Sequence, residues 1–247
     1  MNEDDEAELL RLLEEERLYQ ERNRIQSLYP DTGPLRRGLY AKHLAFFRAG
    51  AERDQNGEPF NERCVMGANR SGKTLACSYE HTCHLTGWYP MWWEGFRFNR
   101  AIVGWAAGED SKSVRESLQA MFLGSPGSFG TGLVPHGNLI QISPRAGVPD
   151  AIDSVTIRSA FGGNSRLLFK SYDQGRESFQ AAHVDVMQFD EEPPADIYSE
   201  GLTRTMSTTP GEPNGLVIAG FTPLRGLSSV VLAYMPGGQQ LDGAVRG

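Results

Sequence analysis

The 247-residue sequence has few cysteines, no long apolar run and little net charge outside its N-terminus. The three cysteines form no C-x-x-C pair, which argues against a disulfide framework and favours a reduced, intracellular protein. No apolar stretch approaches the roughly 20 residues that a membrane-spanning helix needs. The acidic N-terminus also differs from a signal or transit peptide. With 39% hydrophobic residues, the composition predicts one large α/β domain.

The acidic character is concentrated at the N-terminus. Residues 1–24 hold nine acidic residues and four arginines, a net charge of −5 out of a total of −7. The rest of the chain is therefore nearly neutral, and its charge neither supports nor excludes a nucleic-acid partner. We expect residues 1–30 to form a charged helix, in which Leu9, Leu12 and Leu13 begin an apolar stripe. This stripe predicts either packing against the domain or a docking surface for a partner subunit.

One stretch fits the phosphate-binding pattern G-x-x-x-x-G-K-[ST] without a mismatch. It consists of Gly67, Ala68, Asn69, Arg70, Ser71, Gly72, Lys73 and Thr74. The glycines allow the backbone N–H groups to face phosphate oxygens, and the following helix offers its positive end. Lys73 is expected to reach the β- and γ-phosphates, while the Thr74 hydroxyl holds Mg²⁺. A short apolar strand at residues 63–66 precedes the loop and a helix over residues 73–86 follows it, so the motif predicts binding of ATP with Mg²⁺.

A second apolar strand, at residues 184–189, ends in carboxylates. Asp190 and Glu191 follow it directly. The carboxyl end of a central strand lies beside the phosphate loop in an α/β sheet. We therefore expect Asp190 to hold the metal shell and Glu191 to activate the attacking water.

The remaining pattern alternates strands with helices. Further strands are expected at residues 101–106, 139–142 and 216–221, together with a hairpin that pairs residues 155–157 with 167–169. A helix is expected after the capping-box pair Ser113 and Glu116, and another over residues 197–206. This order predicts a mostly parallel sheet with helices on both faces. His81 and His84 lie three residues apart on a helix, but no third ligand is near, so a partly exposed helix face is expected there rather than a metal site.

Taken together, these motifs resemble the large terminase subunit of tailed double-stranded DNA phages, most closely the short-tailed phages that package by the headful. The resemblance rests on the phosphate loop and on residues 189–194, 197–205 and 221–224, which occur in the family's order. It implies a phosphate-loop ATPase of the additional-strand, catalytic-glutamate type.

The resemblance also implies roles for single residues. Lys73, Thr74, Asp190 and Glu191 keep the roles given above. Arg70 matches an arginine that senses or stabilises the γ-phosphate, and Thr222 matches the motif that couples hydrolysis to motion. His43 stands where the family has an adenine-contacting glutamine, so we expect ATP and GTP to compete more evenly than in relatives with glutamine. Arg176 is a candidate for the arginine that one subunit donates to its neighbour's site.

The implied boundaries are an N-terminal helix at residues 1–30, a motor domain at 31–235 and a linker at 236–247. The family's C-terminal nuclease uses an acidic metal-binding cluster, whereas Asp242 is the one acid after Thr222. Nuclease activity is therefore not expected in this chain.

The implied partners are double-stranded DNA, the portal protein of the capsid and the small terminase subunit, with no membrane. The chain is expected to form a homo-oligomeric ring on the portal and to be a monomer in isolation. Its expected location is the cytoplasm of the infected bacterium rather than the mature virion. Two alternatives remain open at this point: a related translocase or helicase-type ATPase, and an ATP-gated assembly module without turnover.

Overall fold

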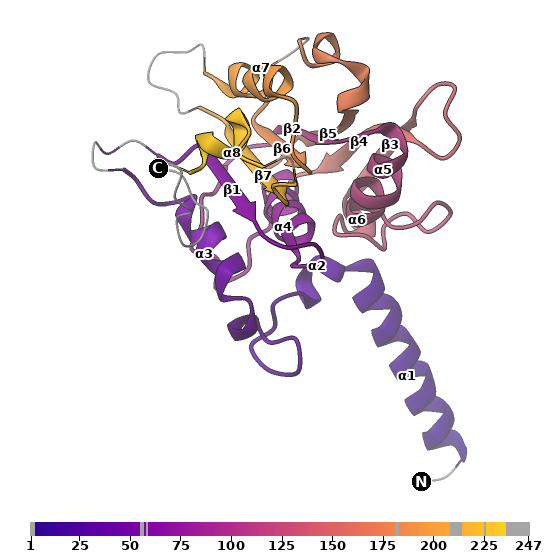
Figure 1. The fold of residues 1–247 in the computed structure, drawn as a ribbon. Helices are drawn as coiled ribbons and strands as arrows, with labels where there is room; N and C mark the ends of the chain where they lie inside the picture. The colour runs from indigo at the N-terminus through magenta and orange to yellow at the C-terminus, as the bar shows by residue number, and fades with distance from the viewer. Residues whose placement is uncertain are drawn as a thin grey trace.

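The computed structural model describes residues 3–54, 57, 59–180, 183–207, 214–224 and 226–235. Within these ranges the chain forms a seven-stranded sheet with helices on both faces (Figure 1). The strands are β1 (Glu62–Met66), β2 (Val103–Gly108), β3 (Leu139–Pro144), β4 (Ile152–Arg158), β5 (Asn164–Ser171), β6 (Val186–Asp190) and β7 (Leu216–Phe221). The α-helices are α1 (Glu3–Arg22), α2 (Arg24–Ser27), α3 (Ala41–Ala49), α4 (Lys73–Thr86), α5 (Ser111–Ser113), α6 (Ala120–Leu123), α7 (Ala195–Thr205) and α8 (Ser229–Ala233). The proposed linker, residues 236–247, lies outside the described residues.

Short helical segments join these elements. A π-helical segment, η2 (Val114–Gln119), connects α5 to α6. The 3₁₀ segments are η1 (Arg37–Leu39), η3 (His136–Asn138), η4 (Tyr172–Gln174) and η5 (Arg176–Phe179).

The strand order is β1-β7-β6-β2-β5-β4-β3. The strands from β1 to β5 in this order pair in parallel, whereas β4 and β3 extend the sheet antiparallel. The last of these strands in sequence, β7, is inserted between β1 and β6. In register, Met66 pairs with Phe221 and Asp190 pairs with Gly220. The carboxyl ends of β1, β6 and β7 therefore meet at one edge of the sheet, and the predicted mostly parallel α/β fold is confirmed.

Two hydrophobic cores lie on opposite faces of the sheet. One core is built with α3, α4 and the α5–α6 segment, and the other with η5, α7 and α8. Every residue of β6 and β7 is buried. Strands that are buried along their whole length are expected in a parallel sheet covered on both faces.

The N-terminal helix differs from the prediction that its stripe packs on the domain. The helix breaks at Asn23, and α1 projects away from the sheet (Figure 1). The leucines Leu9, Leu10, Leu12 and Leu13 are 44–62% exposed. Burial begins only with Ile25 and Tyr29, which join the core under α4. Packing of this stripe against the domain is therefore wrong for α1.

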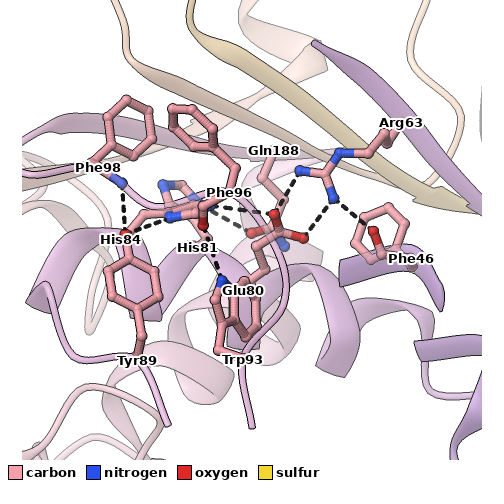
Figure 2. A network of polar contacts seen from close by, with 10 residues as sticks. All are labelled: Phe46, Arg63, Glu80, His81, His84, Tyr89, Trp93, Phe96, Phe98 and Gln188. Atoms are coloured by element: carbon pink, nitrogen blue, oxygen red, sulfur yellow. Dashed lines mark hydrogen bonds and ion pairs between the residues drawn. The ribbon is translucent and has the colours of Figure 1, made fainter. Parts of the chain in front are cut away.

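Helix α4 carries a buried polar network rather than the partly exposed face that was expected for its histidines (Figure 2). The Arg63 guanidinium on β1 donates to both carboxylate oxygens of Glu80, at 2.6 and 3.0 Å, and to the carbonyl of Phe46. His84 contacts the same carboxylate at 3.3 Å through Nε2, and its Nδ1 lies 2.9 Å from the Tyr89 hydroxyl. Although burial favours protonation of Glu80, the charge of Arg63 and the hydrogen bonds from His84 and Arg63 lower its pKa overall.

His81 is likewise fully buried and faces the sheet. Its Nδ1 lies 3.1 Å from Oε1 of Gln188 (Figure 2). Nε2 of Gln188 in turn donates to the Ser78 hydroxyl. The imidazole packs onto Gly104 of β2, where a Cβ atom would overlap the ring. Burial lowers the pKa of His81 to about 3, so the ring is neutral. The prediction of a partly exposed face is wrong, because both histidines lie inside the core, where Gln188 contacts Nδ1 of His81 and where Glu80 and Tyr89 contact His84. Among the described residues no group of three or more His, Cys, Asp or Glu side chains is arranged to hold a metal.

Candidate functional site

The phosphate loop joins β1 to α4 through a left-handed turn. Arg70 and Gly72 adopt φ values of 63° and 84°. For a residue with a side chain, that conformation costs roughly 1–2 kcal/mol, so the strain falls on Arg70 while Gly72 adopts it freely. Gly72 is also the N-cap of α4. The loop therefore delivers Lys73 and Thr74 to the first turn of the helix.

The first helical turn contacts the end of β6. The Thr74 hydroxyl donates to Oδ1 of Asp190 at 2.7 Å. Burial raises the pKa of the Asp190 carboxyl to about 6, while the hydrogen bond from Thr74 opposes the rise. A hydroxyl and a carboxylate side by side are hard oxygen donors, and Mg²⁺ is commonly held by one or two such protein ligands together with substrate phosphates. The residue pair fits the predicted Mg²⁺ site.

Glu191 follows Asp190 in a second strained position. Its φ is 63°, and its N–H donates to the carbonyl of Gly220 at 3.2 Å. The left-handed turn places Glu191 across from the phosphate loop. Both border one cavity of about 420 Å³, lined by Asn69, Arg70, Gly72, Lys73, Thr74, Leu75, Met121 and Glu191.

Thr222 links the end of β7 to the phosphate loop. Its Oγ1 accepts a hydrogen bond from Nζ of Lys73 at 3.0 Å. The same hydroxyl lies 2.8 Å from the carbonyl of Gly67 and 2.9 Å from Oδ1 of Asn69, and its single proton serves one of these acceptors at a time. Nζ of Lys73 also donates to the carbonyl of Ala68. Residues that lie 149 positions apart in sequence thus share one hydrogen-bonded cluster.

His43 packs against the back of the phosphate loop. Its Nδ1 lies 2.9 Å from the Tyr29 hydroxyl, and its Nε2 lies 3.4 Å from the carbonyl of Ser71. The ring occupies the space that a side chain at Gly72 would need. Burial lowers the pKa of His43, although the contact with Ser71 opposes the shift. A neutral ring therefore accepts from Tyr29 and donates to Ser71, a contact that the sequence did not predict.

Arg176 is held within its own chain. Its Nε donates to Oε2 of Glu200 on α7 at 2.9 Å, and the Arg176 side chain is 55% exposed. Arg204 contacts the other oxygen of the same carboxylate at 3.0 Å. Arg176 is not among the residues that line the cavity between the phosphate loop and Glu191.

Two residues near the carboxylates were missed by sequence reasoning. The hydroxyl of Ser117, on the π-helical segment, lies 3.4 Å from Oδ2 of Asp190. The Tyr172 hydroxyl lies beneath the main chain of Asp190 and Glu191. Neither residue belongs to a recognisable motif, because the fold of the sheet, rather than a local sequence pattern, brings each one next to Asp190. A π-helical turn, which is frequent at functional sites, would have been the one local signal for Ser117.

Known proteins similar to this chain are described as terminase large subunits. Residues 64–239 match the family described as the N-terminal part of the terminase large subunit, T4likevirus-type. The large terminase subunit of Salmonella phage P22 is 31% identical over 255 residues, which cover 95% of this chain and 47% of that protein. The chain thus spans about half the length of this curated relative.

Solved structures are similar at lower identity. The large terminase ATPase domain of Thermus phage P74-26 is 17% identical, with a TM-score of 0.40 over 64% of this chain and 58% of that one. A large terminase from a thermophilic bacteriophage, solved in complex with ADP, is 17% identical, with a TM-score of 0.41 over 73% of this chain and 37% of that one.

Proposed function

The chain belongs to the terminase large subunits of phages, and on that basis we propose that it is the ATP-hydrolysing motor domain that drives double-stranded DNA into an empty capsid. One observation supports this most: the carboxyl ends of β1, β6 and β7 and the segments that follow them bring five residues together at one edge of the sheet. These are Lys73, Thr74, Asp190, Glu191 and Thr222. That convergence supplies a cation for phosphate, oxygen donors for a metal and a carboxylate for water.

In the proposed reaction, each residue of this chain has a separate task. Lys73 binds phosphate oxygens of ATP, and the N–H groups of the loop surround them. Thr74 and Asp190 would hold Mg²⁺, which supplies charge neutralisation at the β- and γ-phosphates when bound. Glu191 orients the attacking water and accepts its proton. Arg70, which lines the same cavity, is proposed to contact the γ-phosphate.

Thr222 is the proposed link between hydrolysis and motion. Its hydroxyl touches both Lys73 and the loop backbone, so a change at the phosphates alters the partners of a residue at the end of β7. Helix α8 begins seven residues further along the chain and packs into the core with α7. A shift of Thr222 would therefore reach α7 and α8 through packed side chains.

The proposed partners are double-stranded DNA, the portal protein and the small terminase subunit, with assembly as a ring on the portal in the cytoplasm of the infected bacterium. The 247 residues are proposed to hydrolyse ATP without cutting DNA. A guanidinium from a neighbouring subunit is commonly worth about 10³–10⁵ in the rate of phosphoryl transfer, so the isolated chain is proposed to turn over slowly.

The test separates ATP binding from hydrolysis. Lys73→Ala should weaken binding of a fluorescent ATP analogue, whereas Glu191→Gln should keep binding and abolish turnover, because only the carboxylate acts on water. Glu177→Gln, at an exposed glutamate of η5, is the matched control and should behave as wild type. Wild-type turnover in Glu191→Gln would remove Glu191 from its proposed role.

The packaging part of the proposal needs the full-length protein. DNA filling of empty capsids should proceed with Glu191 intact and stop with Glu191→Gln. Filling that continues in the variant would refute a motor driven by this site.

A further inference from the structure

The Tyr172 hydroxyl lies at the point where β6 ends. Tyr172 follows β5 directly and is buried. Its hydroxyl lies 3.0 Å from the carbonyl of Asp190, 3.1 Å from the carbonyl of Glu191 and 3.3 Å from the carbonyl of Ala107. A phenol has one proton, and the two shorter distances indicate that the carbonyls of Asp190 and Glu191 share it.

Glu191 needs such support because its backbone is strained. Residues with side chains remain in the left-handed region only where several surrounding contacts hold the backbone in that conformation. The N–H of Glu191 is held by Gly220, and its carbonyl is held by Tyr172. These two hydrogen bonds fix the peptide units on both sides of the Glu191 Cα, and with them the direction in which its side chain leaves the backbone.

The phenol is held in a fixed position. Its buried ring packs against Phe189 at a centroid distance of 6.2 Å. This packing keeps the hydroxyl within hydrogen-bond distance of the Asp190 and Glu191 carbonyls.

We propose that Tyr172 is a positioning residue for hydrolysis, whose hydroxyl holds the main chain of Asp190 and Glu191 so that the Glu191 carboxylate faces the phosphate loop. Tyr172 does not line the cavity itself, and its effect passes through the backbone of Glu191. This inference rests on the proposed function of Glu191, but the hydrogen bond itself is testable without turnover.

The chain offers a matched control. Tyr198 on α7 packs against the same Phe189 ring at 5.9 Å. Its hydroxyl donates instead to Oε2 of Glu62 at 2.6 Å, at the amino end of β1, opposite the phosphate loop. Tyr172→Phe and Tyr198→Phe therefore remove the same kind of atom from the same core. The first hydroxyl lies at the carboxyl end of β6 and the second at the amino end of β1.

The first measurement is steady-state hydrolysis together with binding of a fluorescent ATP analogue. Tyr172→Phe should lower kcat about tenfold, the rate equivalent of one hydrogen bond, and should change analogue affinity less than about twofold. Tyr198→Phe should leave kcat unchanged. An equal kcat in the two variants, or a loss of affinity that matches the loss of kcat, would overturn the proposal.

The second measurement is amide hydrogen exchange at Glu191, whose N–H is bonded to Gly220. Exchange should be about tenfold faster in Tyr172→Phe than in Tyr198→Phe, because the turn opens more readily with one hydrogen bond fewer. Unchanged exchange would show that Tyr172 does not hold the turn. If the wild-type chain hydrolyses no ATP, the proposed function fails, and the exchange comparison still decides whether Tyr172 fixes this backbone.

Discussion

Lowering the pH from 7 to 5 should destabilise this fold through its buried histidines. Burial lowers the pKa values of His43, His81 and His84, and the value for His81 falls to about 3. In the unfolded chain a histidine takes up a proton near pH 6.5. Below that pH the unfolded state binds more protons than the folded state, so the stability that neutral burial provides is present above pH 6.5 and is lost as the pH falls toward the folded pKa.

The loss of stability that His81 alone causes is large enough to measure. One unit of difference in pKa corresponds to about 1.4 kcal/mol, so between pH 6.5 and 5 the His81 contribution decreases by roughly 2 kcal/mol. The shifts of His43 and His84 have the same sign and add to this loss. Glu80 contributes little in this window, because its lowered pKa acts below the ordinary carboxyl range. Asp190 acts in the opposite direction, because its raised pKa of about 6 lets the folded state bind a proton that the unfolded carboxyl does not bind between pH 7 and 5. The loss from His81 alone is a large share of the roughly 5–15 kcal/mol that stabilises a typical domain.

Urea unfolding at pH 5, 6 and 7 provides the assay, with His81→Asn as the variant. An asparagine amide can still donate to Oε1 of Gln188, but it does not titrate. The smaller side chain should lower stability at every pH, while the difference in unfolding free energy between pH 7 and 5 should shrink by about 2 kcal/mol. His136→Asn makes the same substitution at an exposed histidine and is the control for the change of side chain. The same pH dependence in His81→Asn as in wild type would refute the argument that burial keeps His81 neutral.

Three further predictions concern single positions. Gly104→Ala should destabilise the fold by about 1–3 kcal/mol in urea unfolding, because the new Cβ overlaps the His81 ring. Wild-type stability of this variant would show that α4 can move away from β2 without loss of stability. His43→Gln should sharpen the preference for ATP over GTP in competition binding, and an unchanged preference would show that His43 does not contact the nucleotide base. Arg176→Ala should abolish a rise in ATPase rate with protein concentration while leaving ATP affinity nearly unchanged. If the rise persists, Arg176 is not the arginine that one subunit donates to its neighbour's site, and its role is the ion pair with Glu200.

The parts of the fold that local chemistry dictates were predictable from the sequence. Helix α4 begins at Lys73 and ends at Thr86 as predicted, because Gly72 and Gly87 both adopt the left-handed conformation that bounds it. The strands β6 and β7 were visible as short apolar runs, since both of their faces are covered. The contact between Thr74 and Asp190 followed from placing the end of β6 beside the phosphate loop.

Other features depend on partners that lie far away in sequence. The histidines of α4 looked like surface residues, because nothing local indicates that Gln188 and Arg63 complete their network. The helix after β2 is capped by Asp110 rather than by Ser113, since Asp110 accepts from both the N–H of Lys112 and that of Ser113. The leucines of α1 have helical spacing, but spacing alone does not say whether another surface covers them.

The insertion of β7 between β1 and β6 bears on how the protein is made. The phosphate loop leaves the ribosome 149 residues before Thr222, a delay of roughly 7–30 s at common elongation rates. Until β7 is made, β1 lacks its neighbour in the sheet and Lys73 lacks its contact with Thr222. Such distant pairing also slows folding. A nucleotide at the proposed site can therefore add its binding energy to the fully paired sheet only after β7 has been synthesised.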